Sequence, residues 1–260
     1  MNCFCTIISP DYYPFTRTMY QSLARYMPDS ILQVLIVGEN ANTVIEKNGN
    51  ILFNRIEELQ DHGLSESIRK KYGETDNIIR WALKPAYISL LLERYENVIY
   101  LDSDLFFTGD ASFLFGELEG APLLLSPHGI STEPLADPEN IAMNNRIGMF
   151  NAGLVGASRS GRPLLEWWAA AILQQMERDE SLGVFADQRY LDLLPVLDEN
   201  VHILRHKGCN AGSWNIHCNP RSLQDGQLLL GGKDPLLFIH FNFETIRQIL
   251  NRNDALLLPY

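Results

Sequence analysis

Two aspartates one residue apart are the residues with the clearest chemical potential in this sequence. Asp102 and Asp104, with Ser103 between them, follow an apolar run at residues 98–101. Two carboxylates at the exit of a buried strand cannot both stay buried without partners, so they either cap and solvate a turn or hold a cation. Mg²⁺ or Mn²⁺, held by few carboxylates and completed by substrate phosphates, suits the second case. Both interpretations remain open at this point.

A phosphatase is another interpretation of the same motif. Enzymes of the haloacid dehalogenase type also carry D-x-D after a strand and use the first aspartate as nucleophile. In that pattern the motif usually follows the first strand, with Thr or Val two residues after the second aspartate. Here the motif lies in mid-chain, Phe106 occupies that position, and no later Asp-Asp pair could bind the metal. The D-x-D phosphatase is therefore the less favoured alternative. The Rossmann dinucleotide fingerprint and the P-loop are both missing.

Short apolar runs alternate with helical stretches along the chain. Strands are expected at residues 4–8, 32–37, 98–101, 122–125, 149–155, 201–204, 227–230 and 236–241. Helices are expected at residues 16–26, from Pro85 onward, at 162–177 and at 187–194. Behind Pro85, one apolar face carries Ile88, Leu91, Leu92 and Tyr95. This alternation predicts an α/β sheet that binds its ligands at the carboxyl ends of the strands.

Composition and charge exclude several classes of function. The chain has 260 residues, 46% of them hydrophobic, with a net charge of -11. This balance argues against nucleic acid as a partner and against stable attachment to an anionic membrane, although Arg69, Lys70 and Lys71 could make peripheral contacts. The N-terminus lacks the pattern of a signal peptide, and no apolar run reaches the length of a transmembrane segment.

The four cysteines are too sparse for a disulfide framework. Cys3 and Cys5 lie on one face of a strand and are expected to be small core residues. Zinc ligands are conceivable near residues 206–218, which hold Cys209, Cys218 and two histidines, but the absence of a C-x-x-C pair disfavours that site. We therefore expect a reduced, cytoplasmic protein.

A series of sequence blocks resembles bacterial GT-A glycosyltransferases related to family 8 and to enzymes of surface-polysaccharide assembly. In chain order these blocks are TIISPDYYPFTRTMYQSL, RWALKPAYISLLL, IYLDSDLFF, LLSPHG, FNAGLVG, LLEWW, VFADQRYLDLLP, GCNAGSWNIH and FIHF. The resemblance implies one GT-A domain over residues 1–260, with a Rossmann-like, mixed, mostly parallel sheet flanked by helices. Residues 1–105 would form the nucleotide-binding half, ending at the D-x-D motif, and residues 106–260 the sugar- and acceptor-binding half.

The resemblance also implies how the donor is held. The base and ribose would be cradled by Thr6, Ile8, Ser9 and Tyr12. An aromatic face suits a flat base, although Tyr12 could instead pack on the sheet edge. Lys84 falls at the position of a cation that faces the donor, and an ordinary exposed lysine is the alternative.

The metal ligands implied by the resemblance are Asp102, Asp104 and His240, with Ser103 also in the donor site. An imidazole ligand suits Mn²⁺ better than Mg²⁺, and the alternative for His240 is a structural histidine. Asn151 and Gly153 would face the transferred sugar, since Asn offers a donor and an acceptor and Gly allows close approach. Their alternative is a bulge or a turn.

The same resemblance implies catalytic roles for Asp187 and Gln188, which would hold sugar hydroxyls beside the anomeric carbon. Asp187 could instead only cap the helix that follows it. The acceptor side would be shaped by Asn210, Trp214, Asn215 and His217.

The implied activity is metal-dependent transfer of a hexose from a nucleotide-diphosphosugar, first among them a UDP-sugar, to a saccharide or a lipid-linked glycan, with retention of configuration. A non-catalytic sugar-nucleotide or glycan-binding relative is the alternative from another class. One departure from the family supports it: where related enzymes often continue as H-F-S-G-F, this chain has His240, Phe241, Asn242 and Phe243. The missing glycine changes the loop beside the diphosphate.

Overall fold

A seven-stranded sheet forms the centre of the protein. The computed structural model describes residues 1–38, 49–60, 62–73, 78–179, 183–242 and 246. The strand order is β10-β6-β7-β4-β1-β2-β3. These strands are β1 (Asn2–Ile8), β2 (Leu32–Ile36), β3 (Ile51–Arg55), β4 (Asn97–Leu101), β6 (Leu123–Pro127), β7 (Phe150–Ser158) and β10 (His202–Ile203). Neighbours pair in parallel except at β7, which runs antiparallel to both β4 and β6. The expected mixed, mostly parallel sheet is confirmed.

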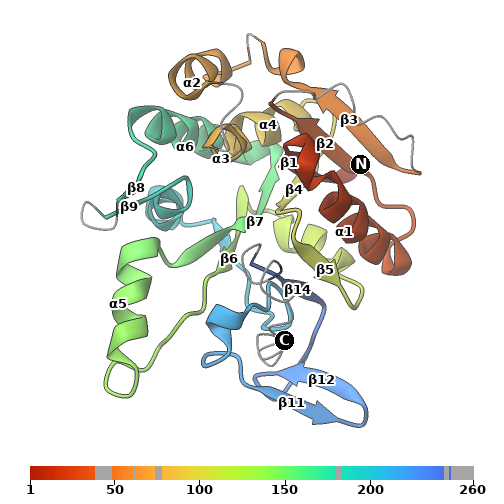
Figure 1. Ribbon diagram of the computed structural model, residues 1–260, viewed down its shortest axis with the longest axis vertical. Coiled ribbons are helices and arrows are strands. Elements are labelled where there is room, and N and C mark those ends of the chain that lie inside the picture. Colours follow the sequence, from red (N-terminus) through yellow and green to blue (C-terminus); the bar gives the residue numbers. More distant parts are fainter. Residues whose placement is uncertain (39–48, 61, 74–77, 180–182, 243–245, 247–260) are drawn as a thin grey trace.

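Helices cover both faces of this sheet, as Figure 1 shows. They are α1 (Tyr13–Tyr26), α2 (Ser65–Tyr72), α3 (Ile78–Ala82), α4 (Lys84–Leu91), α5 (Pro138–Ile147), α6 (Arg162–Gln174) and α7 (Leu194–Leu197). One core layer lies beneath α4 and α6 and the other beneath α1. Alternate side chains of β1 enter opposite layers because successive side chains of a strand point to opposite faces. Cys3 and Cys5 face the first layer and Phe4 faces the second, so both cysteines are core residues, as expected.

The structure corrects two helix boundaries. The helix expected at residues 162–177 ends at Gln174, because Gln175 is extended and the chain continues into β8 (Arg178–Asp179). Lys71 donates hydrogen bonds from Nζ to the carbonyls of Leu173 and Gln174 and so caps that helix end. Residues 188–193 form a 3₁₀ helix that α7 continues. Pro195 in the first turn of α7 lacks the N–H that a continuous α-helix would need there.

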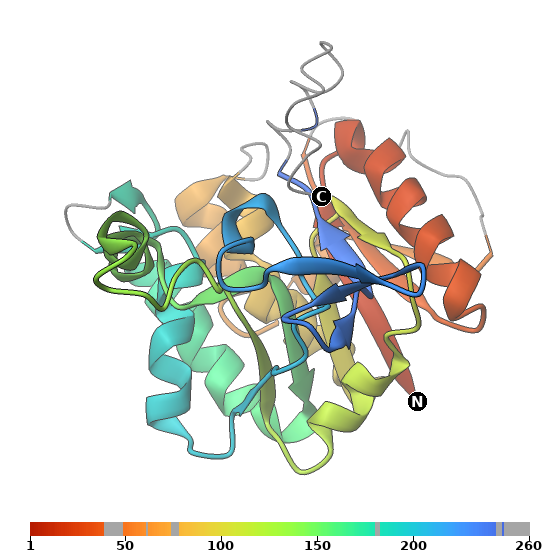
Figure 2. The ribbon, with the colours of Figure 1, turned by 90° about the horizontal axis from the view of Figure 1, so that it is seen from below.

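Three small sheets complete the described part of the fold. They are β5 (Leu105–Phe107) with β14 (Phe238–His240), β8 with β9 (Val184–Phe185), and β11 (Arg221–Gln224) with β12 (Gln227–Leu230) and β13 (Asp234–Pro235). The strand expected at residues 236–241 is found as β14, which is shorter than expected, and β13 lies just before it in a different sheet. In Figure 2 the blue strands β11, β12 and β14 lie together at the end of the molecule nearest the viewer. Among the described residues, no helix is long and apolar enough to cross a membrane.

Candidate functional site

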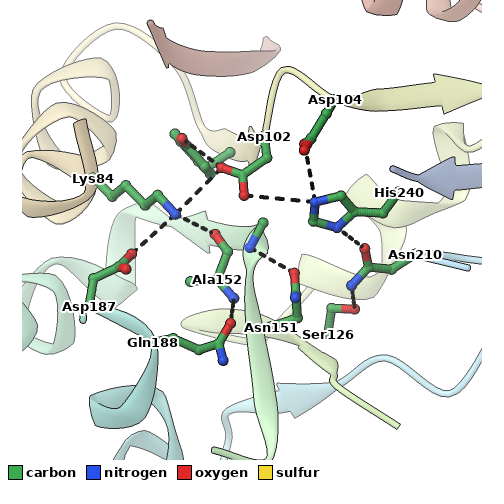
Figure 3. Close-up of polar contacts among 12 residues, drawn as sticks. Lys84, Asp102, Asp104, Ser126, Asn151, Ala152, Asp187, Gln188, Asn210 and His240 are labelled. Atoms are coloured by element: carbon green, nitrogen blue, oxygen red, sulfur yellow. Dashed lines mark hydrogen bonds and ion pairs between the residues drawn. The ribbon is translucent and has the colours of Figure 1, made fainter. Parts of the chain in front are cut away.

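The two aspartates of the D-x-D motif meet a histidine from the far end of the chain. Asp102 and Asp104 follow β4, and His240 is the last residue of β14. His240 Nε2 lies 3.2 Å from Asp104 Oδ1 and 3.9 Å from Asp102 Oδ2 (Figure 3). The three ligand atoms lie within 4.8 Å of one another, and this is the sole group of three such residues found in the described part of the chain. The cysteines and histidines at 206–218 lie within that part and form no such group.

Backbone hydrogen bonds fix these residues. The Asp102 N–H donates to Gly153 O at 2.9 Å, which ties the motif to β7. The Phe241 N–H donates to Asp104 O at 2.9 Å, and β14 pairs with β5 so that His240 lies opposite Leu105. The backbone of the D-x-D turn is thus hydrogen-bonded to β7 and to the residue after β14, two segments that are distant from it in sequence.

Residue 153 must be a glycine, because neighbouring side chains leave no room for a Cβ atom there. A methyl group on its Cα would lie 2.8 Å from Asp102 Oδ2 and 2.7 Å from Asn151 Oδ1, and nearer still to the His240 ring. Any side chain at this position would clash with two of the candidate ligands, Asp102 and His240. Two carboxylates and one imidazole are also donor types that suit Mn²⁺. The residues present therefore fit a divalent cation.

Lys84 lies inside the protein with a side-chain exposure of 2%. Its Nζ is 3.0 Å from Ala152 O, 3.1 Å from Asp187 Oδ2 and 3.5 Å from Asp102 Oδ1. The alternative of an ordinary exposed lysine is wrong. The ammonium donates a hydrogen bond to Ala152 O and forms ion pairs with Asp187 and Asp102 (Figure 3), so Lys84 orients two carboxylates from different segments.

The charges in this cluster shift one another's pKa values. Burial alone would lower the pKa of Lys84, but Asp102 and Asp187 raise it above its usual range. Burial would raise the pKa of Asp102, yet Lys84, His240 and the Tyr100 hydroxyl, which donates to Oδ1 at 3.0 Å, lower it. For Asp187, burial outweighs Lys84 and raises the pKa. Burial would lower the pKa of His240, but Asp104 and Asp102 raise it.

Asp187 and Gln188 lie on the other side of Lys84 from the D-x-D motif. Asp187 occupies the N-cap position of the 3₁₀ helix, but its side chain makes no capping hydrogen bond and turns to Lys84 instead, so the capping alternative is wrong. Gln188 accepts from Ala152 N at 3.2 Å and donates to Ile147 O at 2.8 Å. Both ends of its amide are held, which fixes Gln188 beside Ala152.

The residues expected around the base are divided between core and surface. The side chains of Thr6 and Ile8 are fully buried, so only their backbones can reach a ligand. The Ser9 hydroxyl donates to the Asp11 carboxylate. The ring of Tyr12 has the Arg80 guanidinium 3.9 Å from its centre. These residues lie at the carboxyl end of β1, which pairs in parallel with β4, so they share an edge of the sheet with the D-x-D motif.

Some side chains of the GCNAGSWNIH block contact the candidate metal site and others lie elsewhere. Asn210 accepts a hydrogen bond at 2.7 Å from Nδ1 of His240, directly behind the candidate metal site. The ring of Trp214 meets the His240 ring edge-on, with centroids 5.1 Å apart. His217 lines a separate cavity of about 640 Å³. Asn210 and Trp214 are thus brought to the site, and His217 is not part of this contact set.

Sequence reasoning missed other members of the site. Tyr100, Ser126 and His128 received no role, although Ser126 and His128 stand in the block LLSPHG. The only signal available was their place at or beyond the carboxyl ends of predicted strands. Asn151 Oδ1 accepts from the Gly153 N–H at 2.9 Å, which gives Asn151 a local structural part as well. Phe243, in the altered final motif, lies outside the described residues.

Two curated proteins of one bacterium are similar to the chain in sequence. No family model matches the chain. It is 29% identical over 256 residues to the uncharacterized protein YfnF of Bacillus subtilis (strain 168), covering 95% of this chain and 83% of that protein. It is 28% identical over 252 residues to the uncharacterized YfnD of the same organism, covering 94% and 78%.

Solved glycosyltransferase structures resemble it in fold. Mouse xyloside xylosyltransferase 1 in its apo form aligns with a TM-score of 0.58 and 14% identity, over 94% of this chain and 99% of that one. The galactosyltransferase LgtC in complex with donor and acceptor sugar analogues aligns with a TM-score of 0.52 and 17% identity, over 93% and 87%. The chain therefore has the GT-A glycosyltransferase fold that the sequence resemblance implied.

Proposed function

We propose that this protein is a metal-dependent glycosyltransferase that moves a hexose from a nucleotide-diphosphosugar, first among them a UDP-sugar, to a saccharide or glycoconjugate acceptor. The observation that carries the proposal is the convergence of Asp102, Asp104 and His240 beside a buried Lys84–Asp187 ion pair, at the carboxyl edge of a GT-A sheet. The names of both structural neighbours, a xylosyltransferase and a galactosyltransferase, support the same class.

The donor would lie across the edge formed by β1, β4 and β7. Ser9, Tyr12 and the backbone at Thr6 and Ile8 would hold the base and ribose. Ser103, Asn151 and Gly153 would face the diphosphate and the sugar. Asp102, Asp104 and His240 would hold Mn²⁺ or Mg²⁺, which when bound supplies Lewis-acid stabilisation to the leaving diphosphate. Residues from both proposed halves, 1–105 and 106–260, thus contribute to one site.

Lys84 keeps this site assembled. Its ammonium lies between Asp102 and Asp187, so it holds one carboxylate for the metal and the other for the sugar. A lysine fully enclosed by acceptors contributes a fixed positive charge, which is a form of electrostatic preorganisation. We assign Lys84 this orienting role in place of direct contact with the donor.

The engagement of Asp187 supports the proposal that the transfer retains configuration. An inverting enzyme needs a base within reach of the incoming hydroxyl. Asp187 is buried and ion-paired with Lys84, and Gln188 is anchored to Ala152 and Ile147. In the proposed mechanism both side chains would hold donor hydroxyls and support positive charge near the anomeric carbon, and neither would activate an acceptor.

The acceptor would be a saccharide or a lipid-linked glycan of polysaccharide biosynthesis, approached from the side of Trp214. The four free cysteines fit a cytoplasmic location, since thiols persist in reducing compartments. The phosphatase alternative loses its support because the D-x-D motif lies after β4 of a GT-A fold.

A screen of nucleotide-sugars tests the proposal. We expect one donor to raise the melting temperature in Mn²⁺ but not in EDTA, because a ligand that binds only the native state stabilises it. The same donor should be hydrolysed slowly to free sugar. Stabilisation without hydrolysis, and without transfer to any glycan, would identify a binding protein of the same fold. No stabilisation by any nucleotide-sugar would contradict the proposal.

A further inference from the structure

The side chain of Asn210 hydrogen-bonds to both His240 and Ser126, and we call this pair of hydrogen bonds the Asn210 clamp. Its Oδ1 lies 2.7 Å from His240 Nδ1, and its Nδ2 donates to Ser126 Oγ at 3.0 Å. Both side-chain bonds are buried, and Asn210 is 1% exposed. Figure 3 shows the three residues in a row that leads away from the aspartates. Each polar group of the Asn210 amide therefore has a defined partner.

This geometry selects one form of the histidine. An amide oxygen only accepts hydrogen bonds, so the imidazole nitrogen that faces it must carry a proton. In the neutral ring the proton then sits on Nδ1, and the lone pair sits on Nε2. Nε2 is the atom that faces Asp102 and Asp104. The opposite tautomer would present an N–H to the cation and could not coordinate it.

The backbone fixes Asn210 and His240 relative to each other. The Ala211 N–H donates to Phe238 O at 3.2 Å, and the His240 N–H donates to Ala211 O at 2.9 Å. Asn210 itself has φ +55°, a left-handed conformation that Asn tolerates better than most residues. Asn215 Nδ2 donates to the Asn210 carbonyl at 2.9 Å and holds this turn. Backbone hydrogen bonds thus hold both Asn210 and His240 in the positions that the clamp needs.

We infer that Asn210, held by Ser126, is the positioning residue that makes His240 a metal ligand by fixing its tautomer and ring orientation. The inference rests on the proposed function for the identity of the bound cation. It assigns a role in metal binding to Asn210 and Ser126, which are not themselves ligands. Outer-shell partners of ligating histidines commonly set metal affinity in this way.

The decisive variant is Asn210→Gly, which keeps the left-handed backbone accessible and removes the clamp. We expect its Mn²⁺ affinity, measured by calorimetry, to fall about 10- to 100-fold. The imidazole nitrogen coupling in the Mn²⁺ electron spin-echo spectrum should weaken or vanish. Asn210→Asp should restore both signals, because its carboxylate accepts from Nδ1 and Ser126 can then donate its own hydroxyl proton.

A double-mutant cycle separates positioning from general damage. If Asn210 acts through His240, adding Asn210→Gly to His240→Ala should change Mn²⁺ affinity by less than twofold. Asn144→Ala is the matched control, since Asn144 is a similarly buried asparagine that donates to Ser131 O. It should lower the melting temperature and leave Mn²⁺ affinity unchanged.

A metal-free measurement keeps the inference separate from the proposed function. In the ¹⁵N spectrum of the apo protein at high pH, His240 should be the Nδ1–H tautomer in wild type and should lose that preference in Asn210→Gly. An Nε2–H tautomer in wild type, or the same tautomer preference and Mn²⁺ affinity in both proteins, would overturn the inference. Wild type that shows the expected tautomer but binds no cation would refute the proposed metal dependence and the assignment of His240 as a ligand.

Discussion

Lys84 Nζ lies 3.1 Å from Asp187 Oδ2, and the side-chain exposures of the two residues are 2% and 5%. This is a buried ion pair that joins the start of α4 to the turn before the 3₁₀ helix at residues 188–193. Buried pairs contribute little net stability when intact, because desolvation offsets their attraction. Removing one partner is costly, since the other charge is left without compensation.

Replacing Lys84 should therefore destabilise the protein strongly. In Lys84→Met the buried Asp187 loses its cation, and we expect the free energy of unfolding to fall by about 3–5 kcal/mol. Urea denaturation at pH 7 measures this. Lys71→Met is the control, because Lys71 is exposed and its ammonium caps the end of α6, so the loss of stability should be much smaller. Equal losses in the two variants would show that the Lys84 pair is not structurally important.

Gly153 provides a test of the space between the ligands. Its added methyl would contact Asp102, Asn151 and His240, so Gly153→Ala should weaken Mn²⁺ binding at least tenfold while the protein stays folded. Gly116→Ala is the matched control, because a methyl there meets no heavy atom within 4 Å. Calorimetric titration with Mn²⁺ checks both. Unchanged affinity in Gly153→Ala would place the cation elsewhere.

Asp104 allows the metal interpretation to be tested without a large change in shape. Asp104→Asn should abolish Mn²⁺-dependent binding of a nucleoside diphosphate, because the cation loses a charged ligand. The melting temperature of the apo protein should change little: relief of repulsion with Asp102 is offset by the lost contact with His240. Fluorescence titration with UDP in Mn²⁺ and in EDTA measures the difference. Equal UDP affinity in variant and wild type would defeat the metal assignment.

Burial lowers the pKa of His128 to about 4. Between its ordinary value of 6.5 and that value, the unfolded chain binds a proton that the folded protein does not. Stability should therefore fall as the pH falls through this window, by up to about 3 kcal/mol at its lower end. Denaturation of wild type and His128→Asn in EDTA, at pH 7 and pH 4.5, isolates this contribution. A loss of the same size in both proteins would show that His128 does not titrate as expected.

The sequence predicted the fold through local patterns. Apolar runs and their alternation with helical stretches located β1, β2, β4 and α6 within a few residues. The short strands β5, β8 and β13 were not predicted, because two or three residues carry little periodic pattern. The final strand was expected to begin at residue 236 and begins at Phe238, because Leu236 and Leu237 continue the apolar run between β13 and β14.

The site was predicted less completely, since its contacts join distant segments. The D-x-D motif is local and was recognised directly. The Lys84–Ala152 and Asn210–Ser126 hydrogen bonds span 68 and 84 residues, and no spacing rule connects such pairs. The burial of Lys84 and the anchoring of Gln188 likewise depend on how β7 passes beneath them.

The stereochemical outcome is the prediction that depends most on this arrangement. We expect retention, because Asp187 forms an ion pair with Lys84 and Gln188 holds Ala152 in place at the proposed sugar-binding edge. Gln188→Ala should lower turnover more than donor affinity, since support for charge at the anomeric carbon matters most in the transition state. Its effect on donor binding should stay within a few-fold, measured against Gln174→Ala, since Gln174 is an exposed glutamine at the end of α6. Proton NMR of the freshly formed product reports the anomeric configuration. An axial donor that gives an equatorial bond would refute retention, and Asp187, with a pKa raised by burial, would then be the first residue to examine as the base.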